Sequence, residues 1–478
     1  MVSAEPMAAA GGSPYHHAMD IRTLHDCLAD LDRDLLQGDA AVRVLLLGAL
    51  AGEHVLLIGP PGTAKSELAR RLQRVFAGAR YFERLLTRFS VPEELFGPLS
   101  LRALEDDRYE RLTDGFLPTA QVAFLDEVFK ANSAILNALL TLLNEREFDN
   151  GSGRVAVPLI SVVGATNEVP DDEALQAFYD RFALRVPVEP VDDAHFAALL
   201  QLPAELPQPR ARLEAQALEG LRTRAAALPL PQAVLEQLVQ ARALCATQQI
   251  TVSDRRWRKL AALLQVQAAS RLAADDAEAT VSPWDLWVLP YVLAARPTQV
   301  PVLRDWFLAE IGQAVPADVQ WLGRAAEAFE KQLEIEQAAP ANPGDDSAGK
   351  LALARAIAGP GAQDAEQGLV RIVSDLARKR YSALHVAARV AQVHEARDRA
   401  ALALQAVQAT GVAATAQARA HPWLPPTWRG RIDAVHQDNA QRLATLLARL
   451  QATGDAFAAL PVDAALAAES PTPVAVPA

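Results

Sequence analysis

An octapeptide typical of phosphate-binding loops lies between an apolar run and a helix-forming run. It reads Gly59-Pro60-Pro61-Gly62-Thr63-Ala64-Lys65-Ser66, after Val55–Ile58 and before Glu67–Leu72. In such a loop successive backbone N–H groups converge on phosphate oxygens, and the following helix adds a favourable dipole. Lys65 can reach the β- and γ-phosphates of a nucleoside triphosphate, and the Ser66 hydroxyl can ligate Mg²⁺. Ala64 stands where the strict pattern G-x-x-x-x-G-K-S/T has a glycine, so its methyl group needs a backbone conformation that an L-residue can hold.

Two carboxylates and an amide follow at the ends of later apolar runs. Asp126 and Glu127 end the run that begins at Val122, and Asn167 follows the run Leu159–Ala165. Successive strand residues point to opposite faces, so the two carboxylates cannot share a role. Asp126 can bind Mg²⁺ through its water shell, and Glu127 can polarise the water that attacks the γ-phosphate. The Asn167 amide can hydrogen-bond that water or the γ-phosphate.

Three arginines are candidates for neutralising the charge on a transferred phosphoryl group. Arg181 precedes the last apolar run, and Arg255 and Arg256 lie in the first turn of a helix predicted to begin after Ser253. Arginine stabilises such charge bidentately, which is worth large factors in rate. One of these sites can act within its own subunit and the other across a subunit interface.

The elements that must position these groups alternate short apolar runs with longer helical stretches. This alternation is typical of a parallel sheet covered by helices, and strands that are apolar nearly throughout are buried on both faces. The sequence therefore predicts an α/β domain over residues 20–210, with helices from about Asp20 to Gly52. The five strands of its parallel sheet are expected at His54–Gly59, Arg80–Leu85, Val122–Asp126, Leu159–Ala165 and Ala183–Val188.

The rest of the chain carries helical periodicity without strands. We expect a small helical domain at 211–300, in which Trp257, Leu260, Ala261 and Leu264 share one helix face. A helical bundle is expected at 301–460, with two long helices at roughly Asp364–Arg419 and Trp428–Leu460. A Pro/Gly/Asp/Ser-rich linker is expected at about 337–363, and disordered tails at 1–19 and 461–478.

Composition restricts the class of protein. The chain has 478 residues, of which 51% are hydrophobic and 22% charged, as in soluble proteins of two or three domains. It has no apolar stretch long enough for a transmembrane helix and no signal-peptide pattern. Its two cysteines, Cys27 and Cys245, are far apart, which predicts neither a disulfide framework nor a zinc site and favours the cytoplasm. The net charge of −12 disfavours a nucleic-acid motor and favours protein substrates.

Taken in order, these segments resemble the AAA+ ATPases of the MoxR group, and the RavA-type branch matches best. The similarity extends from about Asp20 to Pro297. It implies a P-loop AAA+ module with a helical lid domain and a C-terminal helical bundle, working as an ATP-hydrolysing ring that remodels or activates proteins. The segments that carry it are Gly59–Ser66, Phe124–Glu127, Asn167, Asp180–Phe182 and Ser253–Trp257, supported by Thr87–Pro98, Tyr109–Thr113 and Ile135–Arg146.

The resemblance also implies roles for single residues, with ATP and Mg²⁺ as cofactors. Residues 59–66 would be the Walker A loop, Asp126 and Glu127 the Walker B pair, and Asn167 sensor 1. Arg181 would be the finger that reaches a neighbour's nucleotide, which implies a homo-hexameric ring. Arg255 would be sensor 2, with Arg256 as its nearest rival. Loops after Phe96 and around Phe148–Arg154 would be the inserted helix and hairpin that face the pore.

The resemblance is thinner in the C-terminal third. The segment His421–Ile432 is similar to a stretch in the helical domain of RavA-type proteins. The interval from about Ala338 to Asp364 is too short and too polar for the small β-containing domain that those proteins can carry. Whatever partner that domain recruits, including lysine decarboxylase, is therefore not expected here. A partner with a von Willebrand factor A domain is the group's commoner companion and is expected.

Three other functions use the same loop. A magnesium-chelatase-like ATPase subunit would drive metal insertion with companion subunits. A nucleic-acid motor is disfavoured by the acidic charge and by the lack of a basic, aromatic patch. A nucleotide-gated scaffold that scarcely hydrolyses ATP is disfavoured by the presence of both Glu127 and Asn167.

Overall fold

The computed structural model describes residues 21–151, 153–203, 208–271, 280–312, 319–339 and 379–476. The tail expected at 1–19 and most of the linker expected at 337–363 lie outside these residues. The chain divides into two compact units, one made of residues up to 311 together with 417–430, and the other of 312–416 together with 431–478. Among the described helices, none combines the length and apolar character needed to cross a bilayer.

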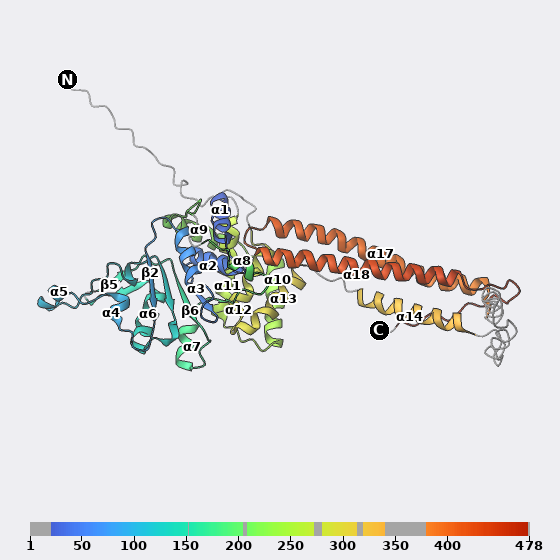
Figure 1. Cartoon of the computed structure of the whole chain (residues 1–478), viewed down its shortest axis with the longest axis horizontal. Helices are drawn as coiled ribbons and strands as arrows, with labels where there is room; N and C mark the ends of the chain where they lie inside the picture. Colours follow the sequence, from blue (N-terminus) through green and yellow to red (C-terminus); the bar gives the residue numbers. More distant parts are fainter. Residues whose placement is uncertain are drawn as a thin grey trace, which may run out of the picture. The chain divides into compact units, whose positions relative to one another are not determined.

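A parallel sheet forms the centre of the first unit (Figure 1). Its five strands lie in the order β2-β3-β6-β1-β7. The predicted fold class is confirmed, and each predicted strand is present with its ends shifted by at most two residues. All four residues of β1 are buried because the strand lies between β6 and β7 and is covered on both faces. The strands are β1 Val55–Ile58, β2 Tyr81–Leu85, β3 Val122–Asp126, β6 Ser161–Thr166 and β7 Leu184–Pro187.

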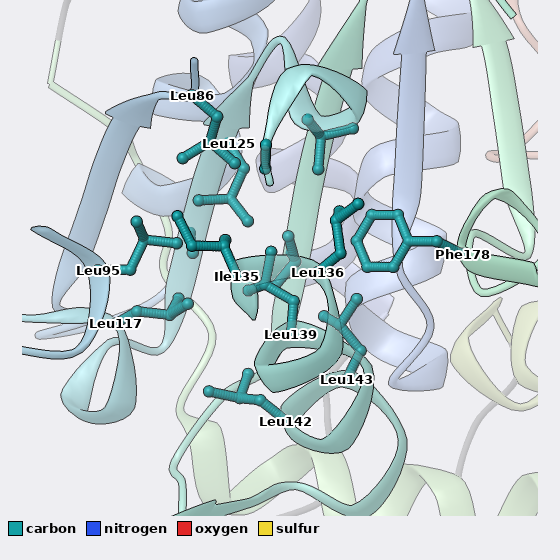
Figure 2. Close-up of a cluster of buried hydrophobic side chains, with 14 of the residues drawn as sticks. Leu86, Leu95, Leu117, Leu125, Ile135, Leu136, Leu139, Leu142, Leu143 and Phe178 are labelled. Carbon is teal, nitrogen blue, oxygen red and sulfur yellow. The ribbon is translucent and has the colours of Figure 1, made fainter. Parts of the chain in front are cut away.

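One face of the sheet packs against α6 (Ser133–Glu145). The Asn132 side chain accepts a hydrogen bond from the Ile135 backbone N–H and so caps the helix N-terminus. Ile135 and Leu139 are fully buried in a cluster with Leu125 of β3 and Phe178, as Figure 2 shows. Burial of each such side chain stabilises the fold by about 1.5–3 kcal/mol. This core holds the ends of β3 and β6 in fixed register.

The opposite face packs against α2 (Asp39–Ala51) and α3 (Lys65–Val75). The helical region expected from Asp20 to Gly52 is two helices, α1 (Ile21–Asp32) and α2. The chain breaks between them because Asp34 and Gln37 take positive φ angles, of 54° and 57°, which no helix continues.

Shorter elements complete the first unit. The expected hairpin is present as β4 (Glu147–Asp149) and β5 (Arg154–Ala156), which pair antiparallel. The remaining α-helices of this unit are α4 Pro92–Phe96, α5 Leu101–Glu105, α7 Glu173–Tyr179, α8 Phe196–Leu199, α9 Ala215–Ala227, α10 Gln232–Thr247, α11 Asp254–Arg271, α12 Leu289–Leu293 and α13 Val300–Glu310. The last five of these, α9 to α13, form the lid together with the 3₁₀ turn Pro283–Val288.

The lid is completed by residues 417–430, which sequence reasoning placed in the C-terminal bundle. The Trp423 indole Nε1 donates to Ser270 Oγ at 2.8 Å, and His421 Nε2 lies 2.9 Å from the buried Asp285 carboxylate. Trp428 packs against Trp287 and Phe307. The boundary expected at residue 300 is therefore displaced, because α13 and this returning segment bury their aromatic side chains in the lid.

The second unit contains α14 (Val319–Ala338) and most of α17 (Ala383–Ala420) and α18 (Pro426–Ala458). Its core includes Phe329, Leu443 and Leu450. Residues 364–378, expected at the start of the first long helix, lie outside the described residues. The disorder expected after Pro461 is wrong for residues 461–476. Val474 packs on this core and the Asp463 N–H donates to the Tyr381 carbonyl, because the tail has apolar residues to bury.

Candidate active site

The octapeptide forms the connection between β1 and α3. Gly59 must be glycine because a Cβ atom there would lie 2.0 Å from the Val188 carbonyl oxygen. The Gly59 N–H donates to the Thr166 carbonyl at 3.0 Å, which ties the loop to the end of β6. The Thr63 hydroxyl closes the loop by donating to the Pro60 carbonyl at 2.9 Å. The loop therefore starts at the carboxyl edge of the sheet and ends at a helix N-terminus, as phosphate binding requires.

Ala64 occupies the position where the strict pattern has glycine. Its backbone is left-handed, with φ 58° and ψ 24°, directly before the first residue of α3. An L-residue in this region costs roughly 1–2 kcal/mol. The loop conformation is thus the one glycine would take, and the alanine carries the strain.

Ala64→Gly is expected to raise the free energy of unfolding by about 1 kcal/mol, because glycine adopts the left-handed region without strain. Urea unfolding monitored by tryptophan fluorescence measures it. The matched control is Ala243→Gly on the exposed face of α10, where glycine should lower stability by about 1 kcal/mol. A stability loss of equal size at both positions would contradict the strain at Ala64.

The Lys65 ammonium group lies inside the loop. Its Nζ donates to the carbonyl oxygens of Gly59 at 2.7 Å and Pro60 at 2.8 Å, and to Asn167 Oδ1 at 3.3 Å. Burial lowers the pKa of Lys65 from its ordinary value, while the carboxylates of Asp126 and Glu127 oppose that shift. A phosphate placed in the loop would meet a partly desolvated ammonium group with few competing water contacts.

Glu127 and Asn167 form a direct pair. The Asn167 Nδ2 donates to Glu127 Oε1 at 2.6 Å, whereas the Asn167 Oδ1 accepts from Lys65. The amide therefore connects Lys65 with Glu127. Glu127 has a left-handed backbone, with φ 52°, at the turn after β3. Such strain in a non-glycine residue is concentrated at functional sites. Lys130 Nζ lies 3.2 Å from the same carboxylate oxygen and helps to hold it.

The two expected metal ligands offer the oxygen atoms that Mg²⁺ prefers. Ser66 is in the first turn of α3, and Asp126 is the last residue of β3. The Asp126 carboxylate accepts a hydrogen bond from the Glu127 N–H at 3.0 Å, which fixes its orientation. Mg²⁺ in nucleotide sites takes one or two protein oxygens, with phosphate and water completing the octahedron. A hydroxyl and a carboxylate are a donor set that fits this ion.

The arginines differ sharply in their surroundings. Arg181 is half-buried after α7, and its buried Nε has no hydrogen-bond partner among the residues that the structure describes. Arg255 is exposed in the first turn of α11. Arg256 is buried, and its guanidinium donates to the carbonyls of Phe182, Ala183 and Val292. The donors of Arg256 are thus occupied by contacts within the fold. This favours Arg255 over Arg256 as the residue that would contact the nucleotide.

A charged cluster around Asp180 was not predicted from the sequence. The Asp180 carboxylate lies 2.6 Å from Arg185 and 3.3 Å from Arg256. The Arg185 guanidinium also stacks on Tyr179, 3.7 Å from the ring centroid. Burial, and then repulsion from Arg185, lowers the pKa of Arg256 to about 10, so it stays charged at neutral pH. The Asp180-Arg181-Phe182 segment gave a hint of this site, but no spacing connects it with Arg256.

Comparisons with known proteins cover the same residues. A family model described as the MoxR domain in the MoxR-vWA-beta-propeller ternary systems matches residues 22–222. A model of the AAA lid domain matches residues 233–307. The first match spans the loop, Glu127, Asn167 and Arg181, and the second spans Arg255 and Arg256.

Three related proteins show how far the similarity extends. An uncharacterized protein of Methanocaldococcus jannaschii is 37% identical over 272 residues, which cover 56% of this chain and 71% of that protein. A second from the same organism is 41% identical over 232 residues, covering 48% and 60% of the two chains. Chaperone MoxR1 of Mycobacterium tuberculosis is 29% identical over 176 residues, which cover 36% of this chain and 45% of that protein.

Proposed function

Because the chain belongs to the MoxR-type AAA+ ATPases, we propose that it assembles into a homo-hexameric ring that hydrolyses ATP to remodel or activate other proteins. The observation that carries the proposal is the chain of contacts Lys65–Asn167–Glu127 at the carboxyl edge of the sheet. A lysine, an amide and a carboxylate thus lie within one connected site, which supports their proposed roles in binding phosphate and activating water. A pure binding module would need only the first of these.

The chemistry follows from what each side chain can do. Lys65 neutralises the β- and γ-phosphates, and Ser66 and Asp126 would hold Mg²⁺, which would screen the phosphate charge. Glu127 accepts the proton of the attacking water, and Asn167 orients that water through the amide that already contacts Glu127. Arg181 stabilises the charge on the transferred phosphoryl group of a neighbouring subunit, and Arg255 does so in its own subunit.

The partner we propose is a protein with a von Willebrand factor A domain. The description of the matching family model names such a domain, together with a beta-propeller, as components of the same systems. Within the family we place the chain in the RavA-type branch, on the segments Ser253–Trp257 and His421–Ile432. The latter contributes His421 and Trp423 to the lid, where they contact Asp285 and Ser270. Co-purification of the chain with a candidate protein of this class, in ATP, tests the partner.

Lys65→Ala is expected to weaken ATP binding by about 10- to 100-fold, because a charge-assisted contact with phosphate is lost. Equilibrium titration with a fluorescent ATP analogue measures it. Lys259→Ala is the control, since that lysine pairs with Glu53, which precedes β1 whereas the loop follows it, and should leave affinity unchanged. An unaltered affinity in Lys65→Ala would remove the phosphate-loop assignment and the proposed function with it.

A further inference from the structure

The segment that carries Arg181 is attached to the lid at nearly every residue around that arginine. On its N-terminal side, the Tyr179 hydroxyl donates to the Ala295 carbonyl at 2.6 Å. On its C-terminal side, the carbonyls of Phe182 and Ala183 each accept from Arg256 at 3.3 Å. Arg181 is therefore positioned by contacts that leave the α/β domain and end on the lid.

Arg256 is the residue through which α11 contacts Phe182 and Ala183. Besides the two carbonyls it donates to Val292 at 2.7 Å and pairs with Asp180 at 3.3 Å, so its guanidinium holds four partners. Burying an arginine is costly, and a hydrophobic side chain of similar volume would fill the space at lower cost. The guanidinium instead fixes the position of residues 180–183 relative to α11, because its donors have a rigid planar arrangement.

Arg255 and Arg256 are consecutive on one helix turn, so their side chains leave α11 in different directions. The proposed role of Arg255 is at the nucleotide of its own subunit, whereas Arg256 contacts the segment of Arg181, which serves a neighbour's nucleotide. A displacement of α11 must move both side chains together because a helix turn is rigid.

We infer that Arg256 is a positioning residue, and this inference rests on the proposed function. Through Arg256, the position of the lid in one subunit determines where Arg181 of that subunit lies when it acts on the nucleotide of the neighbouring subunit. Asp180 serves the same purpose, since its carboxylate joins Arg256 of the lid to Arg185 of β7. The segment keeps its link to the sheet through Arg185 when Arg256 is replaced. An Arg256 variant should therefore fold while losing the contacts between α11 and residues 180–183, although the contact from Tyr179 to Ala295 remains.

The variant Arg256→Met keeps side-chain volume but has no donors. It should lower kcat for ATP hydrolysis about 100-fold through misplacement of Arg181, with KM for ATP changed far less. A purely structural role would instead lower thermal stability and ATP affinity along with kcat. Arg256→Lys retains the positive charge but lacks the planar fork of donors, and its kcat should lie between those of the unaltered chain and Arg256→Met. If Arg256→Met does not fold, Arg256→Lys takes its place in the experiment with mixed rings.

Mixed rings separate action on a neighbour from action within a subunit. Arg256→Met subunits have an intact pocket, and Glu127→Gln subunits have an intact arginine finger. In a random one-to-one mixture about a quarter of the interfaces combine the two intact halves, because each neighbour is drawn independently. We expect ATPase activity well above the sum of the separate variants, and a similar recovery for Asp180→Asn in place of Arg256→Met.

The reference experiment is a one-to-one mixture of Arg181→Ala subunits with Glu127→Gln subunits, because it tests the proposed arginine finger directly. Recovery with Arg181→Ala but none with Arg256→Met or Arg256→Lys would overturn the positioning role and leave the proposed function intact. Failure of the Arg181→Ala mixture would remove the finger in trans, and the positioning role with it. A loss of ATP affinity in Arg256→Met subunits comparable with their loss of kcat would also overturn the inference.

Discussion

Arg181→Ala is expected to lower kcat for ATP hydrolysis by about 10³- to 10⁵-fold, the range that arginine fingers contribute in phosphoryl transfer. The affinity of the subunit's own pocket for ATP should stay close to that of the unaltered chain, because no described contact joins Arg181 to Lys65 or to residues 59–66. Steady-state ATPase assays and titration with a fluorescent ATP analogue measure the two quantities. Among the described residues, the Nε of the half-buried Arg181 has no hydrogen-bond partner, so no contact seen within the subunit accounts for this arginine.

Arg242→Ala on the exposed face of α10 is the matched control for this change, and should leave kcat and affinity unaltered. If Arg181→Ala retained more than about a tenth of the turnover, its side chain would not be stabilising transferred charge. The exposed Arg255 would then be the next residue to replace.

Glu127→Gln is expected to lower kcat by about 10²- to 10⁴-fold, the contribution of a positioned general base. The amide keeps the size of the carboxylate but cannot accept the proton of the attacking water. ATP binding should persist, since Lys65 and the loop are untouched, and the variant should hold nucleotide long enough to capture protein targets. Single-turnover hydrolysis, measured beside equilibrium binding, separates the two effects.

Glu236→Gln, an exposed residue of α10, controls for the loss of a negative charge elsewhere on the surface. Normal turnover in Glu127→Gln would place the catalytic base at another residue. Weak ATP binding in this variant would show that the contact from Asn167 to Glu127 shapes the loop as well as the water site.

Local patterns were sufficient to predict the sheet and the nucleotide loop. Strands buried on both faces are apolar along their whole length, and β3 was found at the predicted residues Val122–Asp126. The phosphate-binding loop was predicted from the order in the sequence of an apolar run, glycines, Lys65 and a helix-forming run. The direct contact between Glu127 and Asn167 was not predicted, although the neighbouring parallel strands β3 and β6 place their carboxyl ends at one edge.

The choice between Arg255 and Arg256 could not be made from the sequence. Both follow Ser253 in one helix turn, and only the burial of Arg256 among the carbonyls of Phe182, Ala183 and Val292 distinguishes them. Those partners lie far away in the chain, where no periodicity points to them. The docking of residues 417–430 escaped prediction for the same reason, since Trp423 and Ser270 are brought together only by the folded lid.

The return of residues 417–430 to the lid divides the helical unit into two segments of the chain, 312–416 and 431–478. A chain cut after α13 would lose Trp423 and Trp428, and would leave Asp285 and Ser270 without two of their partners. Domain exchange between relatives should therefore use three junctions, near residues 312, 416 and 431, instead of one. Evolution faces the same constraint: a relative that lacks α17 and α18 must still fill the part of the lid that Trp423 and Trp428 occupy here.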